Sequence, residues 1–259
     1  MRPDVSNPGP IERHIVDTIL GTRELGPNSV LIVHSAFASL SRQGLRAERF
    51  CQALLDALNG GTLLMPTMTW RTVTPDNPVF DEMATPSHTG ILTEVFRTAF
   101  ATHRSLHATH SVAGCGPLAA KLLSTHHEGS TPCAANSPYG LIRDHDAHIL
   151  LIGVGLESCT AIHHAEEMMA EDIYVQPTKE GVEYQLRSRH GSVHRVLTRR
   201  HPRLPRDFPS FGPELAQRGH LITGKALGVA WQLISARGLY QTLFEALAAN
   251  RAATLVATV

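Results

Sequence analysis

The sequence predicts an α/β protein that folds as an α/β/α sandwich, with a mainly parallel central sheet and an added antiparallel segment. Over the first two thirds of the 259 residues, short apolar, β-branched runs alternate with helical patterns. This alternation is typical of parallel strands joined by helical crossovers. After residue 174, two alternating runs follow each other closely, as the strands of an antiparallel hairpin do. We expect a single domain over residues 1–259.

Three buried strands are expected in the alternating part. The run SVLIVHSAFASL (29–40) is too short for a helix and ends in small polar residues, as a buried parallel strand does when it reaches a functional loop. TLLMP (62–66) and HILLIGV (148–154) are the other two runs. Because ligands of open α/β sheets gather at the carboxyl ends of the strands, the residues after these runs are candidates for a site.

Helical patterns and turns fill the rest of the chain. Ile11, Ile15 and Ile19 recur every four residues, which predicts an amphipathic opening helix. Further helices are expected at 46–58, 90–100, 116–123 and 160–170 and through the last part of the chain, 207–249. A histidine-rich turn is expected at 104–114, and a hairpin of 182–189 and 192–199. The irregular stretch 67–90 is long for a compact domain, which favours a functional or lid-like loop.

Composition restricts the class of partner. Hydrophobic residues make up 42% and charged residues 18%, which is typical of a globular chain. Basic and acidic residues both number 23, so no net charge draws the protein to nucleic acid or to an anionic membrane. A signal peptide and a run of about 18 apolar residues are missing from the sequence, so we expect a cytoplasmic location. Four scattered cysteines without CxxC spacing argue against disulfides and thiolate metal sites.

The segment TAIHHAEEMMAE (160–171) follows the third strand and carries the strongest catalytic pattern. If Thr160 caps the helix, His163 lies inside its first turn and Glu166 lies one turn further on the same face. A carboxylate at this spacing fixes the imidazole tautomer and leaves the other nitrogen as a proton acceptor. Glu167 has suitable spacing as well. Such a pair is often only structural, but its place at the end of a strand favours catalysis.

Sixteen histidines also raise the alternative of a histidine-rich metal hydrolase. The histidines that lie close together in the sequence are His103, His107, His110, His126, His127, His145, His148, His163 and His164. None of them forms HExxH or another recognised ligand string, so we expect no catalytic metal.

Five fragments together resemble one family: VLIVHSAFASL, GTLLMPTMTW, RSLHATHSVAGCGPLA, SPYGLIRDHDAHILLIGVG and TAIHHAEE. In this order and spacing they resemble the aminoglycoside 3-N-acetyltransferases, from about residue 10 to the C-terminus and most strongly over 28–172. The resemblance implies an α/β/α fold distinct from the commoner acetyltransferase fold. It also implies acetyl transfer from acetyl-CoA to a substrate amine, with His163 as the essential histidine and Glu166 as its companion carboxylate.

The resemblance also implies a set of cofactor-binding residues. His34-Ser35 and His110-Ser111 match two histidine-serine pairs of the family. The loop after the first strand should lie along the CoA cleft, with Ser35 and Ser39 as its polar contacts. Small hydroxyl side chains suit the phosphates and the narrow pantetheine arm of CoA.

We therefore expect a CoA-dependent N-acyltransferase that acts on an aminoglycoside or a small biosynthetic amine and is a monomer or a homodimer. A natural-product enzyme that takes the acyl group from a carrier protein, and a catalytically silent acyl-CoA-binding module, stay open as alternatives. An enzyme for polycationic substrates should offer several acidic groups, yet this chain is neutral overall. Its segment 186–206 is basic, which suits a solvated hairpin edge, the CoA 3′-phosphate, an anionic acceptor or an acidic carrier protein.

Overall fold

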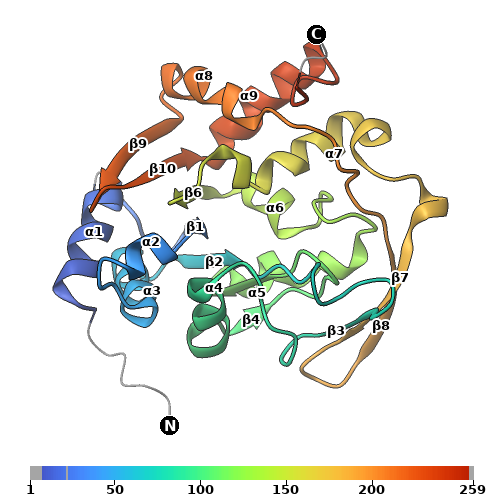
Figure 1. Cartoon of the computed structure of the whole chain (residues 1–259), viewed down its shortest axis with the longest axis horizontal. Coiled ribbons are helices and arrows are strands. Elements are labelled where there is room, and N and C mark those ends of the chain that lie inside the picture. Colours follow the sequence, from blue (N-terminus) through green and yellow to red (C-terminus); the bar gives the residue numbers. More distant parts are fainter. Residues whose placement is uncertain (1–7, 22, 257–259) are drawn as a thin grey trace.

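The structure is a computed structural model, and it describes residues 8–21 and 23–256 (Figure 1). Its helices are α1 (Pro10–Leu20), α2 (Ala38–Ser41), α3 (Ala47–Ala57), α4 (Ile91–Val95), α5 (Ala119–Leu123), α6 (Pro138–Leu141), α7 (Ala161–Tyr174), α8 (Gly212–Gln217) and α9 (Ala236–Ala249). Its strands are β1 (Ser29–Ser35), β2 (Thr62–Pro66), β3 (Val79–Asp81), β4 (His103–Arg104), β5 (Val112–Cys115), β6 (Asp146–Ile152), β7 (Val182–Arg187), β8 (Val193–Thr198), β9 (Leu221–Ala226) and β10 (Val229–Ser235).

Seven strands form the central sheet in the order β4-β5-β2-β1-β6-β10-β9. The three central strands β2, β1 and β6 run parallel, and the outer strands join them in antiparallel pairs. Val30 of β1 lies opposite Thr62 of β2 and Ala147 of β6, which sets the three carboxyl ends along one edge. The three parallel strands are those that the apolar runs predicted.

Helices cover both faces of this sheet, as Figure 1 shows. Alternate side chains of a strand point to opposite faces. Accordingly, Val30 and Ile32 of β1 belong to one core cluster with residues of α6, α7 and α9. Leu31 and Val33 belong to a second cluster with residues of α1 and α3. The predicted α/β/α sandwich is confirmed.

The predicted hairpin is also confirmed and forms a second, smaller sheet. β7 and β8 pair antiparallel, and β3 adds to β7 in parallel. β3 comes from the loop that follows β2, so this sheet attaches the long irregular stretch to the rest of the chain. A small core of its own holds it together, made of Val73, Phe80, Ala108, Tyr184 and Leu186.

The prediction of helix through 207–249 is wrong for its middle part, where residues Leu221–Ala226 form strand β9. Residues Val229–Ser235 form strand β10, which pairs antiparallel with both β6 and β9, and α9 starts only at Ala236. Leu227 and Gly228 both have positive φ, at 49° and 76°, which is the backbone of a two-residue hairpin turn. Buried Val229, Trp231 and Leu233 alternate with more exposed neighbours, and this period of two was missed.

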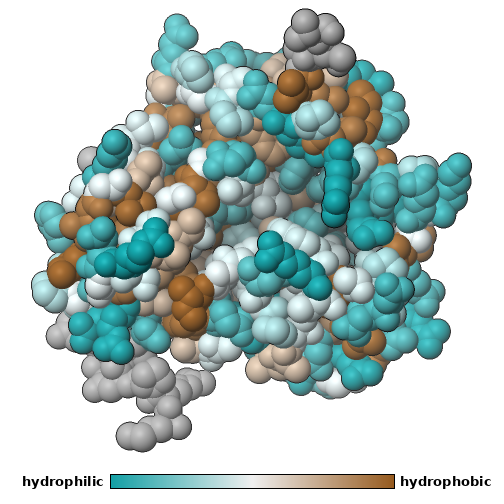
Figure 2. Space-filling model, in the orientation of Figure 1, coloured by the Kyte–Doolittle hydropathy of each residue, from teal (hydrophilic) through white to brown (hydrophobic). Residues whose placement is uncertain are grey.

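Two further details differ from the sequence predictions. The histidine-rich turn contains β5, a short strand between β4 and β2 whose residues are buried. The apolar side of α1 is formed by Ile15, Val16, Ile19 and Leu20, whereas Ile11 is half exposed. None of the described helices has the length and apolar character of a membrane span. On the face in Figure 2, hydrophobic residues lie in several separate areas, and the surface is hollowed near its centre.

Candidate active site

A cavity of about 340 Å³ lies at the carboxyl ends of the parallel strands. Its wall combines the end of β1, the residues after β2 and β6, the start of α7, and His110 from the histidine-rich segment. The lining residues are Val33, His34, Ser35, Pro66, Met68, Trp70, Thr89, Thr93, His110, Val154, Glu157, Ser158, Cys159, Thr160 and His163. The site therefore lies at the edge of the sheet where α/β proteins bind ligands.

His163 and Glu166 meet as their spacing predicted. The Nδ1 atom of His163 lies 2.6 Å from Oε2 of Glu166, and the imidazole lines the cavity. An ionised carboxylate can only accept a hydrogen bond, so Nδ1 of a neutral His163 carries the proton and Nε2 keeps its lone pair. This arrangement can take a proton from a group in the cavity.

Glu166 is completely buried, and three side chains hold it in place. Besides His163, its carboxylate accepts hydrogen bonds from Nε of Arg206, at 3.0 and 3.1 Å, and from the hydroxyl of Thr254, at 2.6 Å. Burial alone would raise the pKa of Glu166, but the hydrogen bonds and the nearby positive charge hold that pKa below its ordinary value. Glu166 is therefore ionised, as an orienting partner must be.

The pKa of His163 is lowered to about 4, chiefly because the ring is removed from water. The imidazole of His201 and the guanidinium of Arg206 lower it further, whereas Glu166 acts in the opposite direction. His110 lines the same cavity as His163. His163 is consequently neutral at physiological pH, which is the state that accepts a proton.

A second pair of a carboxylate and a histidine lies beside the first. Glu167 does not contact His163; its Oε1 atom lies 2.6 Å from Nε2 of His201. The same carboxylate accepts bonds from the hydroxyl of Thr131 at 2.5 Å and the N–H of Cys133 at 2.9 Å. The ring of His201 lies against that of His163, with 4.4 Å between their centroids. The ambiguity between Glu166 and Glu167 is thereby resolved in favour of Glu166.

Thr160 occupies the N-cap position of α7, but the expected capping bond from its side chain is wrong. Thr160 has helical backbone angles, with φ −58° and ψ −26°, and its side chain makes no capping hydrogen bond. A 3₁₀ turn at Leu156–Ser158 leads directly into α7, so backbone carbonyls accept from the first amides: Ile162 N–H donates to Cys159 and His163 N–H to Thr160. The Thr160 side chain lines the cavity instead.

The five residues predicted to bind the cofactor occupy three places. His34, Ser35 and His110 line the cavity together with His163. Ser39 lines an adjoining groove, where it accepts a hydrogen bond from Arg42. Ser111 is completely buried behind the wall. The structure therefore brings His34, Ser35 and His110 to the candidate base, and leaves Ser39 and Ser111 away from it.

The adjoining groove continues the cavity, because Val154 and Glu157 line both. Its other walls come from Ser39 and Arg42 after β1, and from the turn between β9 and β10. Gly153 lines the groove directly after β6 and has a φ of 70°, a backbone conformation that glycine adopts without strain. The groove thus offers an elongated molecule a path to His163, with a cation at its outer part.

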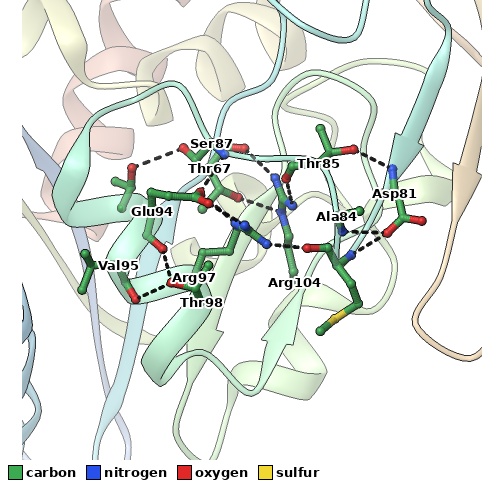
Figure 3. A network of polar contacts seen from close by, with 12 residues as sticks. Thr67, Asp81, Ala84, Thr85, Ser87, Glu94, Val95, Arg97, Thr98 and Arg104 are labelled. Atoms are coloured by element: carbon green, nitrogen blue, oxygen red, sulfur yellow. Dashed lines mark hydrogen bonds and ion pairs between the residues drawn. The ribbon is translucent and has the colours of Figure 1, made fainter. Parts of the chain in front are cut away.

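The long loop after β2 is anchored by polar contacts. The guanidinium of Arg104 is buried and donates to the carbonyls of Thr67, Glu82 and Thr85. Glu94 accepts from the backbone N–H of Ser87 and pairs with Arg97, which in turn bonds to the loop. Figure 3 shows these side chains converging on the loop from β4, from α4 and from the π-helical turn Phe96–Phe100 that continues α4. The wall that the loop gives to the cavity is therefore preformed.

Sequence reasoning missed the roles of Arg206 and His201. Both lie in the basic segment 186–206. The sequence is compatible with two roles for this segment, a solvated hairpin edge and a binding site for an anionic group. Arg206 instead donates to Glu166, while Arg199 pairs with Glu171 and Arg189 with Glu82. Three of the seven arginines of this segment are thus paired with glutamates of the same chain. The high density of arginine and histidine in this segment indicates a functional role, but it does not identify the carboxylates that Arg206 and His201 contact.

One group in the described residues could hold a metal ion: Cys133, Glu167 and His201, whose ligand atoms all lie within 4.8 Å of one another. In the structure a hydrogen bond already joins Glu167 and His201, and burial raises the pKa of the Cys133 thiol well above its ordinary value. A metal would have to displace both protons.

A family model described as aminoglycoside 3-N-acetyltransferase matches residues 32–248 of this chain. The chain belongs to the aminoglycoside 3-N-acetyltransferase family. The match spans β1 to α9 and therefore includes every residue that lines the cavity.

Curated family members resemble parts of the chain. Aminoglycoside N(3)-acetyltransferase IV of Salmonella sp is 32% identical over 154 residues, which cover 58% of this chain and 56% of that protein. Aminoglycoside N(3)-acetyltransferase IX of Micromonospora chalcea is 26% identical over 179 residues, which cover 62% of this chain and 63% of that protein. The matched part thus spans less than two thirds of these relatives' own length.

Solved structures of the family share the fold. A structure of aminoglycoside acetyltransferase AAC(3)-IVa in complex with a gentamicin superimposes with a TM-score of 0.77 at 24% identity, covering 95% of this chain and 91% of that one. A structure of YokD from Bacillus subtilis superimposes with a TM-score of 0.69 at 20% identity, covering 90% of this chain and 97% of that one. These likenesses support the architecture described above.

Proposed function

We propose that the protein is an N-acyltransferase that moves an acetyl or other short acyl group from acyl-CoA to a primary amine of an aminoglycoside or a related small molecule. The observation that carries this proposal is the neutral His163, hydrogen-bonded to an ionised Glu166 at the wall of a cavity. Membership of the family supports it, as does the complex of AAC(3)-IVa with a gentamicin.

The proposed reaction is a direct transfer. The acceptor nitrogen attacks the thioester carbonyl, Nε2 of His163 takes the proton from that nitrogen, and the carbon–sulfur bond breaks. The proton then passes to the departing thiolate, so the products are an amide and free CoA. Ser35 and Ser158 line the same cavity and offer hydroxyl groups to the developing oxyanion.

The cavity and the adjoining groove fit acetyl-CoA as the second substrate. Their continuity through Val154 and Glu157 suits a long, narrow pantetheine arm. Arg42, hydrogen-bonded to Ser39 at 3.1 Å, supplies a cation and a hydroxyl for phosphate at the outer part. A carrier protein would present the same arm, so a donor comparison between acetyl-CoA and acetyl-pantetheine on a carrier separates the two.

Thiol release from acetyl-CoA in the presence of an amine library tests this proposal. We expect His163→Ala to lower kcat by roughly 10²- to 10⁴-fold, the usual contribution of a positioned base. Glu166→Gln should lower it as well, because the amide no longer holds the proton on Nδ1. His164→Asn is the matched control: His164 is adjacent but packs against Tyr240 and bonds to the Cys133 carbonyl. Unchanged turnover in His163→Ala would refute the mechanism.

A metal hydrolase remains a second candidate because of the group formed by Cys133, Glu167 and His201. Elemental analysis of the purified protein distinguishes the two functions. Stoichiometric zinc that is removed together with activity by a chelator would favour the hydrolase, whereas full activity in metal-free protein would favour the transferase.

A further inference from the structure

Trp70 exposes its indole at the cavity. It follows the end of β2, lines the cavity, and is 45% exposed. Trp231, the other tryptophan of the chain, is buried. A large ring left open to water on a cavity wall is a surface for a ligand rather than for the core.

Aromatic rings continue from Trp70 to the candidate base. The centroid of Trp70 lies 5.4 Å from that of His110, and His110 lies 6.1 Å from His201. His201 in turn lies 4.4 Å from His163. His88 also packs edge-on against Trp70, with 4.4 Å between the ring centroids. Of these rings, Trp70, His110 and His163 line the cavity, so an aromatic surface extends along it to the candidate base.

Negative charge is scarce on this wall. Glu157 is the one carboxylate among the described residues that line the cavity, and its Oε1 atom already accepts from the N–H of Gly155 at 2.7 Å. The carboxylate of Glu166 is fully buried and occupied by Arg206, Thr254 and His163. The wall thus offers few partners for ammonium groups.

The two imidazoles that contact Trp70 are uncharged at neutral pH. Burial lowers the pKa of His110 well below its ordinary value, and burial and Arg71 together lower the pKa of His88. An ammonium group that leaves water needs a paired carboxylate, and a polycation needs one for each charge. A ligand with a flat, apolar ring can bury that ring without a carboxylate partner.

Size favours a small acceptor as well. The cavity of about 340 Å³ is at the low end of ligand pockets, which run from roughly 300 to 1,000 Å³. It must also admit the thioester end of the donor. Because Arg104 and Glu94 anchor the loop that carries Trp70, the wall does not have to form around the ligand (Figure 3).

We propose that the acceptor is a compact primary amine with one aromatic or planar ring and at most one positive charge, whose ring lies against Trp70 while its nitrogen reaches His163. This inference rests on the N-acyltransferase activity proposed above. It separates this chain from the relatives whose solved complexes contain a gentamicin or sisomicin. Trp70 then determines specificity and takes no part in proton transfer.

The test compares 2-phenylethylamine with kanamycin as acceptors for acetyl-CoA, with thiol release as the readout. We expect kcat/KM for 2-phenylethylamine to exceed that for kanamycin by at least about 10-fold. Binding is measured in parallel by calorimetry. Trp70→Ala should weaken binding of 2-phenylethylamine by about 10-fold, and Trp70→Phe should retain most of it. Met83→Ala is the control, because Met83 is 58% exposed on the same loop but does not line the cavity.

Each outcome decides one claim. A higher kcat/KM for kanamycin, or equal binding of 2-phenylethylamine by the parent and Trp70→Ala, overturns the inference and leaves the transferase intact. Binding of 2-phenylethylamine that depends on Trp70, without thiol release from any amine of the library, supports the ligand class and refutes the transferase. Release of thiol with 2-phenylethylamine, reduced in Trp70→Ala, supports both.

Discussion

The imidazole of His201 lies against that of His163, with centroids 4.4 Å apart and ring planes inclined by 31°. The two rings belong to separate elements: His163 lies on α7, and His201 lies in the segment after β8. Each is joined to its own buried carboxylate, Glu166 and Glu167. Glu166 and Glu167, neighbours on one helix, thus each hold one of two adjacent imidazoles. Of these two histidines, His163 lines the cavity.

Removing His201 should shift the pH dependence of the reaction. Burial and His201 both lower the pKa of His163, so His201→Ala removes a nearby imidazole and admits water. The pKa of His163 then rises, and the acid limb of kcat/KM moves to higher pH. A pH profile from about 3.5 to 8 covers both the lowered pKa of the parent and the ordinary histidine pKa, and it measures the shift. His194→Ala, from the neighbouring strand β8, is the control. Identical acid limbs in His201→Ala and the parent would contradict this role.

The anchor at Arg104 should matter for acceptor binding. Arg104→Lys cannot reach the carbonyls of Glu82 and Thr85 together with Thr67, so the loop carrying Trp70 loosens. Losing hydrogen bonds of this charged group costs about 2 kcal/mol, or ~4–8 °C in Tm. We expect KM for the acceptor to rise by about 10-fold, with a smaller change in kcat.

Steady-state kinetics and thermal unfolding measure these two effects. Arg218→Lys is the matched control, because Arg218 makes exposed ion pairs with Glu214 and Glu245. A KM and a Tm in Arg104→Lys equal to those of Arg218→Lys would show that the loop does not depend on this anchor.

Cys159 lines the cavity but should not become acylated. Burial raises the pKa of its thiol to about 12, so almost none is thiolate at neutral pH. We expect Cys159→Ala to keep kcat within about threefold of the parent, because the hydroxyl and imidazole groups remain in place. Mass spectrometry of the protein after mixing with acetyl-CoA should show no added acetyl group. An acetylated peptide containing Cys159 would replace direct transfer with a two-step reaction.

Buried neutral histidines should make the fold sensitive to acid. Burial lowers the pKa of His34 and His126 to about 4. Between about pH 6.5 and 4 the unfolded chain binds protons that the folded chain does not, so stability falls as pH falls. Each such histidine contributes at most about 1.4 kcal/mol per pH unit.

Urea unfolding at about pH 7, 6 and 5 measures that slope. His126→Asn should make the slope shallower, since Asn does not titrate. His14→Gln, at an exposed position of α1, should leave it unchanged. Equal slopes in the parent and in His126→Asn would show that the burial of His126 does not contribute to the loss of stability in acid.

The sequence by itself determined the parallel centre of the sheet and the pairing of His163 with Glu166. β1, β2 and β6 are short apolar runs whose burial on both faces leaves a local signature. His163 and Glu166 face each other because three residues make nearly one helical turn, which is a local property of α7. The same local logic identified the hairpin of β7 and β8.

Only the tertiary structure decided the surroundings of that pair. Arg206, Thr254 and His201 lie 40, 88 and 34 residues along the chain from the carboxylates that they contact. The β9–β10 hairpin escaped prediction because an apolar run such as VAWQLIS is compatible with both a strand and a helix until its neighbours are known. Backbone spacing fixes which side chains of one element share a face, whereas contacts between distant elements depend on how the whole sheet and its helices pack.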